Sequence, residues 1–553
     1  NLRENDFIPH NKQVAMNSSK LSIFLQKNEK LIPVLLFIIF VLITTPGIAN
    51  VWNPDELVHR VSNALEGTWK FDETNFDYPS LPKYVMFGAG KLMEAFDFTA
   101  FDFPTVARFI TVLLGGLIIV LVYQLTRKVG GNIYAALLAA LFTLSSSEFS
   151  INARFAHNDL YLIFFLLLTV YAVVNYRLTT SQLWLYAAFL FVGMAISSKY
   201  NGISMIALPV LVFILDNYKV LREKILPTFE TFFISAVLVA LGYAIGTPKS
   251  LLWMAFYFKR ALPVIFRHAS YGRTPDSIVG LLGQWQVMWQ SFSAPVFLLF
   301  MIAFGYWVWK LLSKKVTIEM PQQKSLAVIL LAIMIFDLPI MISYNYQARF
   351  FLMFIPLFSV ITGIAIVAWG AWLGQRISTL TKNILAVGVL LTIIFALMRV
   401  ASVALLIKND ARIPAAAFIA TLPADTSLEY TLYPPNIPAD HFEREHNYPV
   451  FFLKFIGQEV PVVKANKAFN TGATGLTKRD TDYLVIDSFT YARFSDEYIC
   501  TNNSVECNFF DDLLAGETEY QLIGDFSYEL PTWLPKVSLD FVNPSIQVFE
   551  RVR

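Results

Sequence analysis

The chain has 553 residues, of which 56% are hydrophobic and only 15% are charged, and its mean hydropathy is +0.53. This composition excludes an ordinary soluble globular protein and indicates a polytopic α-helical membrane protein. A formal net charge of +2 gives no electrostatic reason to expect a nucleic-acid partner.

Apolar, charge-poor stretches predict about eleven membrane spans. Their approximate cores are residues 31–51, 105–126, 132–150, 160–176, 183–198, 203–216, 229–246, 293–312, 325–343, 350–370 and 384–406. No small-residue cleavage site follows the first span, so we expect a retained signal anchor. Lys and Arg gather in the loops on the side of the N-terminus, which predicts a cytoplasmic N-terminus and a multi-pass protein of the plasma (inner) membrane.

Composition divides the chain into three parts. Residues 1–30 are predicted to be a polar cytoplasmic segment, and residues 31–406 a membrane domain with outer loops at 52–104 and 247–292. The second of these loops interleaves aromatic and basic residues, which is typical of an interfacial aromatic belt. After residue 406, Asp, Glu, Asn and Pro become more frequent. We therefore expect a small extracytoplasmic α/β domain over 407–553.

Short apolar runs predict the elements of this last domain. We expect a helix near 411–421 and strands near 427–433, 483–486 and 546–553. Cys500 and Cys507 frame a short polar loop, and an oxidising compartment would let them form a structural disulfide.

An acidic pair follows the first span directly. Asn53-Pro54-Asp55-Glu56 has the pattern of a helix start, with Asn53 as the cap, Pro54 in the first position and Glu56 reaching back to the Asn53 amide. Two interpretations stay open. In one, the acidic pair only begins an amphipathic helix on the membrane surface. In the other, Asp55 faces a cavity there and does chemistry.

Asp159 is the second acidic candidate, because it stands at the outer end of a predicted span. The helix dipole favours a carboxylate there, and a simple capping role would explain it. Since the charge pattern places Asp55 on the same face, the sequence also indicates a site with two carboxylates.

Several cations lie against the outer ends of spans, where Lys and Arg are normally scarce. Arg154, Lys199 and Arg349 are in such positions, and Lys83 closes the first outer loop. These side chains either extend to lipid headgroups or share an anionic ligand. Three exceptions to the charge rule at one depth favour the shared ligand.

The sequence contains no His/Cys cluster with metal-ligand spacing, no glycine-rich phosphate loop and no Gly-x-Ser-x-Gly elbow. It therefore requires no cofactor, and a role for a divalent metal stays open.

Five motifs on the predicted outer face resemble those of the GT-C glycosyltransferases that use polyprenyl-phosphate sugars. The closer likeness is to the branch of the protein O-mannosyltransferases and the lipid A aminoarabinose transferases. In chain order the motifs are Asp55-Glu56, the turn Tyr78–Tyr84, the approach Arg154–Asp159, the turn Lys199–Gly202 and the segment Arg349–Pro356. The resemblance covers residues 30–370. The turn has Pro-Ser-Leu-Pro where relatives often have adjacent prolines.

The resemblance implies an inverting glycosyltransferase that moves a monosaccharide from a polyprenyl-phosphate donor to a protein, lipid or glycan acceptor at the outer face. Asp55 and Asp159 would be the catalytic carboxylates, while Lys83, Lys199 and Arg349 would meet the donor phosphate.

Five further residues would support this site. They are Glu56, Tyr84, Arg154, His157 and Tyr200. Among them, Arg154 is expected to order Asp159 through a charge-assisted hydrogen bond.

Two other classes of function remain. One is a transporter or lipid flippase, whose charges would mark a translocation path. The other is a non-catalytic membrane scaffold with an outer partner-binding domain. The candidate charges cluster at one face instead of the midplane, which favours the enzyme over the transporter.

Overall fold

The protein is described here by a computed structural model. It describes residues 20–67, 76, 78–223, 225–270, 281–313, 321–342, 347–373, 376, 378–438, 441–442, 444–447, 480–495, 497–502, 504–537, 539 and 541–552.

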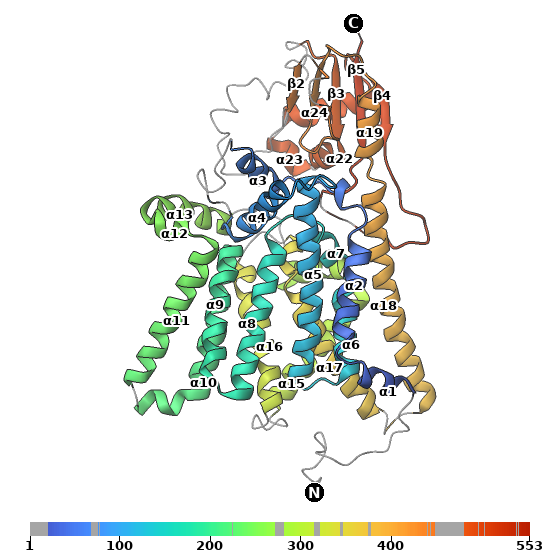
Figure 1. Ribbon diagram of the computed structural model, residues 1–553. Helices are drawn as coiled ribbons and strands as arrows, with labels where there is room; N and C mark the ends of the chain where they lie inside the picture. Colours follow the sequence, from blue (N-terminus) through green and yellow to red (C-terminus); the bar gives the residue numbers. More distant parts are fainter. Residues whose placement is uncertain are drawn as a thin grey trace.

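The larger part of the molecule is a bundle of roughly parallel and antiparallel helices (Figure 1). The bundle helices are α2 (Ile32–Thr44), α5 (Phe103–Lys128), α6 (Ile133–Leu144), α8 (Asp159–Thr179), α9 (Gln182–Ser198), α10 (Ala207–Glu223), α11 (Ile225–Gly246), α15 (Ala294–Leu312), α16 (Pro321–Ile342), α17 (Phe354–Leu373) and α18 (Thr379–Lys408). They coincide with the eleven predicted apolar stretches.

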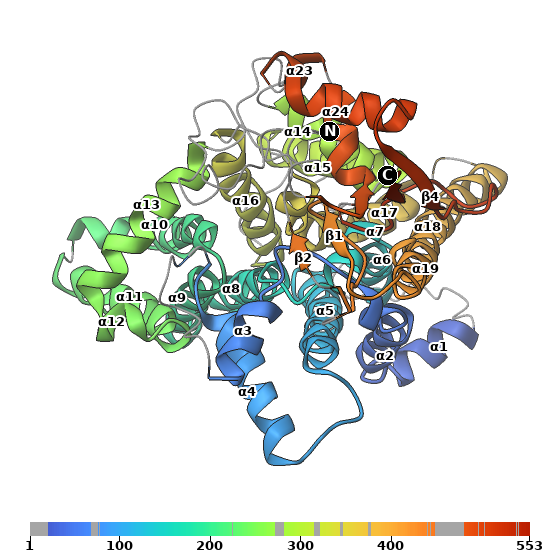
Figure 2. The same ribbon diagram turned by 90° about the horizontal axis from the view of Figure 1, so that it is seen from above.

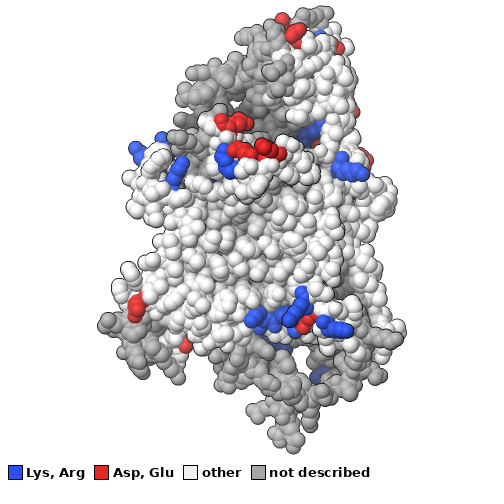
Figure 3. All heavy atoms as spheres, viewed as in Figure 1, with Lys and Arg blue, Asp and Glu red and all other residues white. Residues whose placement is uncertain are grey.

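Length and hydropathy make these helices membrane-spanning. Among the described residues, seven helical segments are long and apolar enough to cross a bilayer, and four more apolar helices are shorter. A broad surface free of Lys, Arg, Asp and Glu separates two charged levels in the face that Figure 3 shows. The chain is therefore a multi-pass membrane protein, as predicted.

Shorter elements cover one end of the bundle, which we call the upper face after its place in Figure 1. They are α3 (Val58–Leu65), α4 (Leu81–Ala95), α7 (Ser147–Asn152), η2 (Tyr200–Ile206), α12 (Lys249–Leu252), α13 (Met254–Ser270), α14 (Leu281–Phe292) and η3 (Ala348–Phe351). The remaining helix, α1 (Lys20–Lys27), lies at the opposite end.

Close packing fixes the bundle around α8, whose side chains are mostly buried. On one side α8 packs against α9, which in turn packs against α11. Gly193 and Gly242 allow this last approach, because a Cβ on Gly193 would lie 2.2 Å from the Val239 carbonyl oxygen. Small residues at helix crossings let backbones come this close in membranes.

The chain after α18 forms a small α/β domain on the upper face (Figures 1 and 2). Its five-stranded sheet has the order β2-β1-β3-β5-β4, in which β2, β1 and β3 are parallel and β5 is antiparallel to both β3 and β4. The strands are β1 (Ser427–Tyr430), β2 (Arg444–Asn447), β3 (Tyr483–Asp487), β4 (Tyr520–Phe526) and β5 (Ile546–Arg551). The predicted positions of β1, β3 and β5 are therefore correct.

The helices of this domain are short. They are α19 (Arg412–Ile419), α22 (Ser488–Tyr491), η5 (Ala492–Ser495), α23 (Glu497–Asn502) and α24 (Ser504–Ala515). Cys500 on α23 and Cys507 on α24 form a disulfide, which confirms the predicted pairing. The bond joins two helices next to the apolar cluster under the sheet.

A cluster of buried apolar side chains holds the C-terminal domain against the membrane domain. Val403 and Ile407 of α18 pack with Ile151, Leu539 and Val542 in one buried cluster. Burial of such side chains stabilises the contact by roughly 25 cal/mol for each Å² removed from water. The domain therefore packs directly on the upper face of the bundle.

Glu56 does not cap a helix, contrary to the sequence prediction. Helix α3 begins only at Val58, and the Glu56 carboxylate accepts two hydrogen bonds from Arg108, of 2.9 and 2.8 Å. It also accepts the N–H of Ala156 at 2.8 Å. Its side chain is fully buried, and there a bidentate guanidinium satisfies a carboxylate better than the Asn53 amide would.

This buried pair predicts a stability effect. Glu56→Ala leaves the Arg108 guanidinium buried without its counter-charge, which costs about 3–5 kcal/mol. We expect a clearly lower midpoint of thermal unfolding for the purified protein in detergent.

Glu94→Ala is the control, because Glu94 forms an exposed pair with Lys91. Such a pair contributes about 0–1 kcal/mol, so this variant should unfold close to wild type. Equal unfolding midpoints for the two variants would contradict the structural role of Glu56.

Candidate active site

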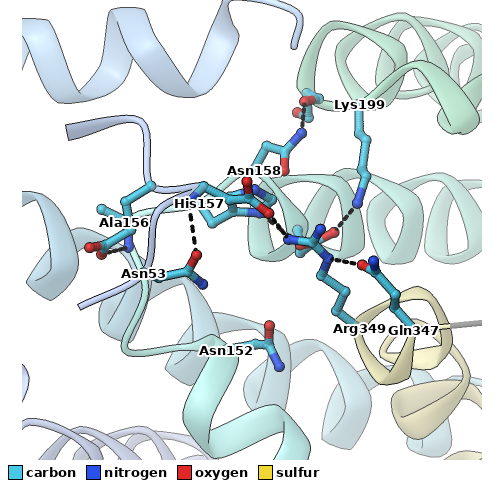
Figure 4. Close-up of polar contacts among 12 residues, drawn as sticks. Asn53, Asn152, Ala156, His157, Asn158, Lys199, Gln347 and Arg349 are labelled. Atoms are coloured by element: carbon cyan, nitrogen blue, oxygen red, sulfur yellow. Dashed lines mark hydrogen bonds and ion pairs between the residues drawn. The ribbon is translucent and has the colours of Figure 1, made fainter. Parts of the chain in front are cut away.

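Asp55 lies in the turn before α3 and pairs with Arg349, which is 294 residues further along the chain. Its backbone N–H donates to Asn53 Oδ1 at 2.9 Å, which holds the turn. Arg349 Nη1 donates to Asp55 Oδ2 at 2.8 Å, and Arg349 Nε donates to Gln347 Oε1 at 2.7 Å (Figure 4). The Asp55 side chain keeps 35% of its surface exposed, so it is accessible to a substrate.

Asp159 is the first residue of α8 and is more enclosed than Asp55, with only 5% of its side chain exposed. One carboxylate oxygen is 2.7 Å from His157 Nδ1, and the other accepts a 2.5 Å hydrogen bond from Lys199 Nζ. The His157 ring meets Tyr78 edge-on. Asp159 is therefore held by two side chains instead of serving only as a cap.

Several buried polar atoms next to Asp159 have no hydrogen-bond partner among the residues that the structure describes. They are His157 Nε2, Asn158 Oδ1 and Asn201 Oδ1. Buried polar groups are almost always paired, so a cluster of unpaired ones marks a place where a ligand or water completes the bonding.

A small pocket joins the two ion pairs. Lys199, Arg349, Asp159 and Asn201 line it together with Phe350. Its volume of about 10 Å³ has room for a single water. The Lys199 ammonium and the Arg349 guanidinium lie 5.3 and 6.0 Å from the centre of the Phe350 ring, so one aromatic ring contacts both cations.

Burial and neighbouring charges shift the pKa values of three side chains in the site. Burial lowers the pKa of Lys199, and the neighbouring Asp159 opposes this shift. Burial alone would lower the pKa of Arg349, but the neighbouring Asp55 and Asp159 carboxylates oppose this effect and the pKa is raised. Burial raises the pKa of the Tyr78 phenol, so Tyr78 stays neutral.

A second, larger cavity of about 550 Å³ lies between the membrane domain and the C-terminal domain. Its polar lining residues are Asn53, Glu148, Asn152, Gln290, Ser291, Gln347, Arg349 and Arg493. Phe489, Leu539 and Phe541 add apolar surface from the C-terminal domain. Of the described residues, only Arg349 lines both this cavity and the small pocket.

Four sequence-predicted residues therefore come together: Asp55, Asp159, Lys199 and Arg349. His157, predicted only as a supporting residue, contacts Asp159 directly. Lys199 and Arg349 do not extend to lipid headgroups, because both donate to carboxylates.

The predicted role of Arg154 is wrong. It was expected to order Asp159, but its fully buried guanidinium donates to the Ser150 carbonyl and hydroxyl and to the Ile43 carbonyl. These carbonyl acceptors belong to neighbouring segments that Arg154 ties together. His157 and Lys199 take the position next to Asp159 that was assigned to Arg154.

The other predicted residues lie outside the pocket. Lys83 is fully buried in the first turn of α4 and does not line it. Tyr84, the next residue, is half-buried. The Tyr200 hydroxyl donates to the Phe76 carbonyl at 2.8 Å, which joins η2 to the first loop. Glu56 is enclosed and inaccessible to substrate.

The sequence interpretation missed several contributors. Gln347 orients Arg349, Tyr78 packs on His157, and Asn158 donates to the Ser198 carbonyl at 3.2 Å. Of the missed residues, Arg108 could have been found from the sequence, because it is a cation near the outer end of an apolar span. It is the partner of Glu56.

Among the described residues, no three His, Cys, Asp or Glu side chains are grouped so that they could hold a metal ion. The described charged and titratable side chains that meet at the site are two carboxylates, an imidazole and two cations.

Comparisons with known proteins agree with this architecture. Residues 87–260, from α4 to α13, match the family model described as "Dolichyl-phosphate-mannose-protein mannosyltransferase". No curated protein sequence matches the chain.

Solved structures extend the likeness beyond that segment. The oligosaccharyltransferase of Archaeoglobus fulgidus is similar over 92% of this chain and 76% of its own, with 13% identity and a TM-score of 0.50. ArnT from Cupriavidus metallidurans is similar over 96% of this chain and 98% of its own, with 14% identity and a TM-score of 0.49.

The fold is thus similar to that of the oligosaccharyltransferase over 92% of this chain, and the segment that matches the family model contains Asp159 and Lys199. The resemblance that the outer-face motifs indicated is confirmed: this chain has the fold of the GT-C glycosyltransferases.

Proposed function

We propose that this protein is an inverting membrane glycosyltransferase, which moves a monosaccharide from a polyprenyl-phosphate donor to an acceptor hydroxyl. The observation that carries the proposal is the pairing of two carboxylates with two cations, Asp55 with Arg349 and Asp159 with Lys199. Three of these side chains, Asp159, Lys199 and Arg349, line one small pocket. The family model that matches residues 87–260 is named for a dolichyl-phosphate sugar, which supports this class of donor.

The donor phosphate would bind to Lys199 and Arg349. Each cation donates one hydrogen bond to a carboxylate, and Arg349 donates a second one to Gln347. An ammonium has three N–H donors and a guanidinium five, so both retain donors for phosphate oxygens. As the bond between the sugar and the phosphate breaks, these cations stabilise the charge that develops on the leaving polyprenyl phosphate.

Asp55 would serve as the general base. The acceptor oxygen attacks the anomeric carbon and the bond from that carbon to the phosphate oxygen breaks. The acceptor proton passes to the Asp55 carboxylate. Arg349 keeps Asp55 in position until the acceptor arrives. Asp159, held by His157 and Lys199, would position the sugar or the acceptor.

The topology belongs to the same proposal. We place the N-terminal segment 1–30 in the cytoplasm, the membrane domain at 31–406 and the C-terminal domain 407–553 outside, because the cationic loops favour that orientation. Transfer would then occur at the outer face, where the site lies beneath the C-terminal domain.

Asp55→Asn tests the general base. The substitution preserves size and polarity but removes the proton acceptor, so we expect transfer to slow by at least about a hundredfold. The measurement is single-turnover transfer from a radiolabelled prenyl-phosphate sugar to membrane-extract acceptors, with donor binding determined separately.

Asp97→Asn is the matched control, because Asp97 is an exposed aspartate after α4. It should transfer sugar at the wild-type rate. If Asp55→Asn also turns over at nearly the wild-type rate, Asp55 is not the base. Uptake of the donor without any transfer by wild type would instead support a transporter.

Lys199→Met tests the donor phosphate site. Loss of one charge-assisted hydrogen bond, about 1.5–3 kcal/mol, should weaken donor binding by roughly 10- to 100-fold. Lys199→Arg keeps the charge and should bind the donor more tightly than Lys199→Met does.

Lys91→Met removes an exposed lysine from α4 and serves as the control in the same binding assay. Donor affinity that is equal in wild type, Lys91→Met and Lys199→Met would remove Lys199 from the donor site.

The disulfide tests the orientation. If the C-terminal domain lies outside the reducing cytoplasm, Cys500 and Cys507 should be recovered as a disulfide-linked pair from freshly isolated membranes. Mass spectrometry of unreduced, alkylated peptides measures this. Two fully alkylated thiols would place the domain in a reducing compartment and reverse the proposed topology.

A further inference from the structure

The cavity between the two domains has no part in the donor chemistry, yet it meets the site at Arg349. The guanidinium that holds Asp55 therefore lies at the boundary between the small pocket and a space of about 550 Å³. A molecule in that space would be next to the side of the site where Asp55 is exposed.

The C-terminal domain faces this cavity with the end of its sheet at which ligands usually bind. Strands β1 and β3 are parallel, and in open α/β sheets ligands bind outside the carboxyl ends of such strands. Asp487, the last residue of β3, accepts hydrogen bonds from Thr431, from the Tyr433 backbone and from Thr490. These bonds fix the segments that follow β1 and β3.

Arg493 extends from that fixed edge to the cavity. Its Nη2 donates to the Tyr433 hydroxyl at 2.7 Å, and its guanidinium lies 5.3 Å from the centre of the Tyr433 ring. Tyr433 is in turn packed against Trp52, Phe489 and Phe541. The arginine is therefore held in place by a rigid aromatic cluster that joins both domains.

No carboxylate of the described residues forms an ion pair with Arg493. By contrast, Arg349 is paired with Asp55, and Glu148 on the cavity wall contacts Asn152. A half-buried guanidinium that has one hydrogen bond to a phenol retains most of its five donors. Planar guanidinium donors match carboxylate and phosphate oxygens.

We propose that this cavity is the acceptor site, and that Arg493 binds an anionic group, phosphate or carboxylate, which the acceptor carries apart from its reacting hydroxyl. The proposal rests on the proposed glycosyl transfer. It gives the C-terminal domain a direct part in acceptor selection, in a cavity that the amide side chains of Asn53, Asn152 and Gln290 also line.

The test measures binding without transfer, so that its outcome is independent of the proposed reaction. Full-length protein in nanodiscs of neutral phosphatidylcholine is first saturated with polyprenyl phosphate, which occupies the donor site. N-acetylglucosamine 1-phosphate and N-acetylglucosamine are then titrated as probes. Wild type should bind the phosphorylated probe at least about tenfold more tightly, the effect of one charge-assisted hydrogen bond.

Three variants make the assignment specific. Arg493→Gln should lose the preference for the phosphorylated probe, and Arg493→Lys should keep part of it. Lys536→Gln removes an exposed positive charge from the same domain and should bind as wild type does. Unchanged thermal unfolding of each variant shows that the domain remains folded.

Nanodiscs that contain phosphatidic acid separate the two sources of the anion. Displacement of the phosphorylated probe by this lipid identifies a lipid-borne acceptor, and no displacement identifies a soluble one. Equal affinity of wild type for the two probes, or an undiminished preference in Arg493→Gln, overturns the proposal. Either result would leave the Asp55 transfer assay unaffected.

Discussion

The ion pair between Asp55 and Arg349 joins two loops that are 294 residues apart in the chain, and the geometry of the site depends on it. Each partner is held from its own side, Asp55 by Asn53 and Arg349 by Gln347. Charges in partly enclosed sites require such partners, because an unpaired charge there is costly. The pair therefore brings the first loop and the start of α17 to the same point.

A second set of contacts supports that arrangement from below. Glu56 binds Arg108 on α5 and the Ala156 backbone before α8, so the residue next to Asp55 is fixed to two helices of the bundle. Neighbouring acidic residues thus have different tasks. The enclosed Glu56 fixes the loop to the bundle, while the partly exposed Asp55 remains accessible to a substrate.

The C-terminal domain completes the upper face by contact with the same loop. Trp52, three residues before Asp55, packs edge-on against Tyr433, and the Arg412 guanidinium lies 5.4 Å from the centre of the Trp52 ring. The segment that carries Asp55 therefore lies between bundle and sheet domain.

The sequence by itself determined the membrane class, the positions of the spans, the strands β1, β3 and β5, and the likeness to the GT-C glycosyltransferases. Apolar length and alternation are local properties, and an isolated charge beside a span is visible without coordinates. For this reason the sequence indicated Asp55, Asp159, Lys199 and Arg349 together, and these are side chains that the fold brings close to one another.

Only the tertiary structure decided which charges pair. Arg154 and Lys199 have the same signal in the sequence, yet Arg154 binds carbonyl oxygens of Ser150 and Ile43 while Lys199 binds Asp159. Glu56 has a capping pattern, yet its partner is 52 residues away. A long side chain can satisfy its charge with any acceptor within reach, and the helix packing decides which acceptors those are. The cavity beside Arg493 likewise exists only because two separately folded parts of the chain meet there.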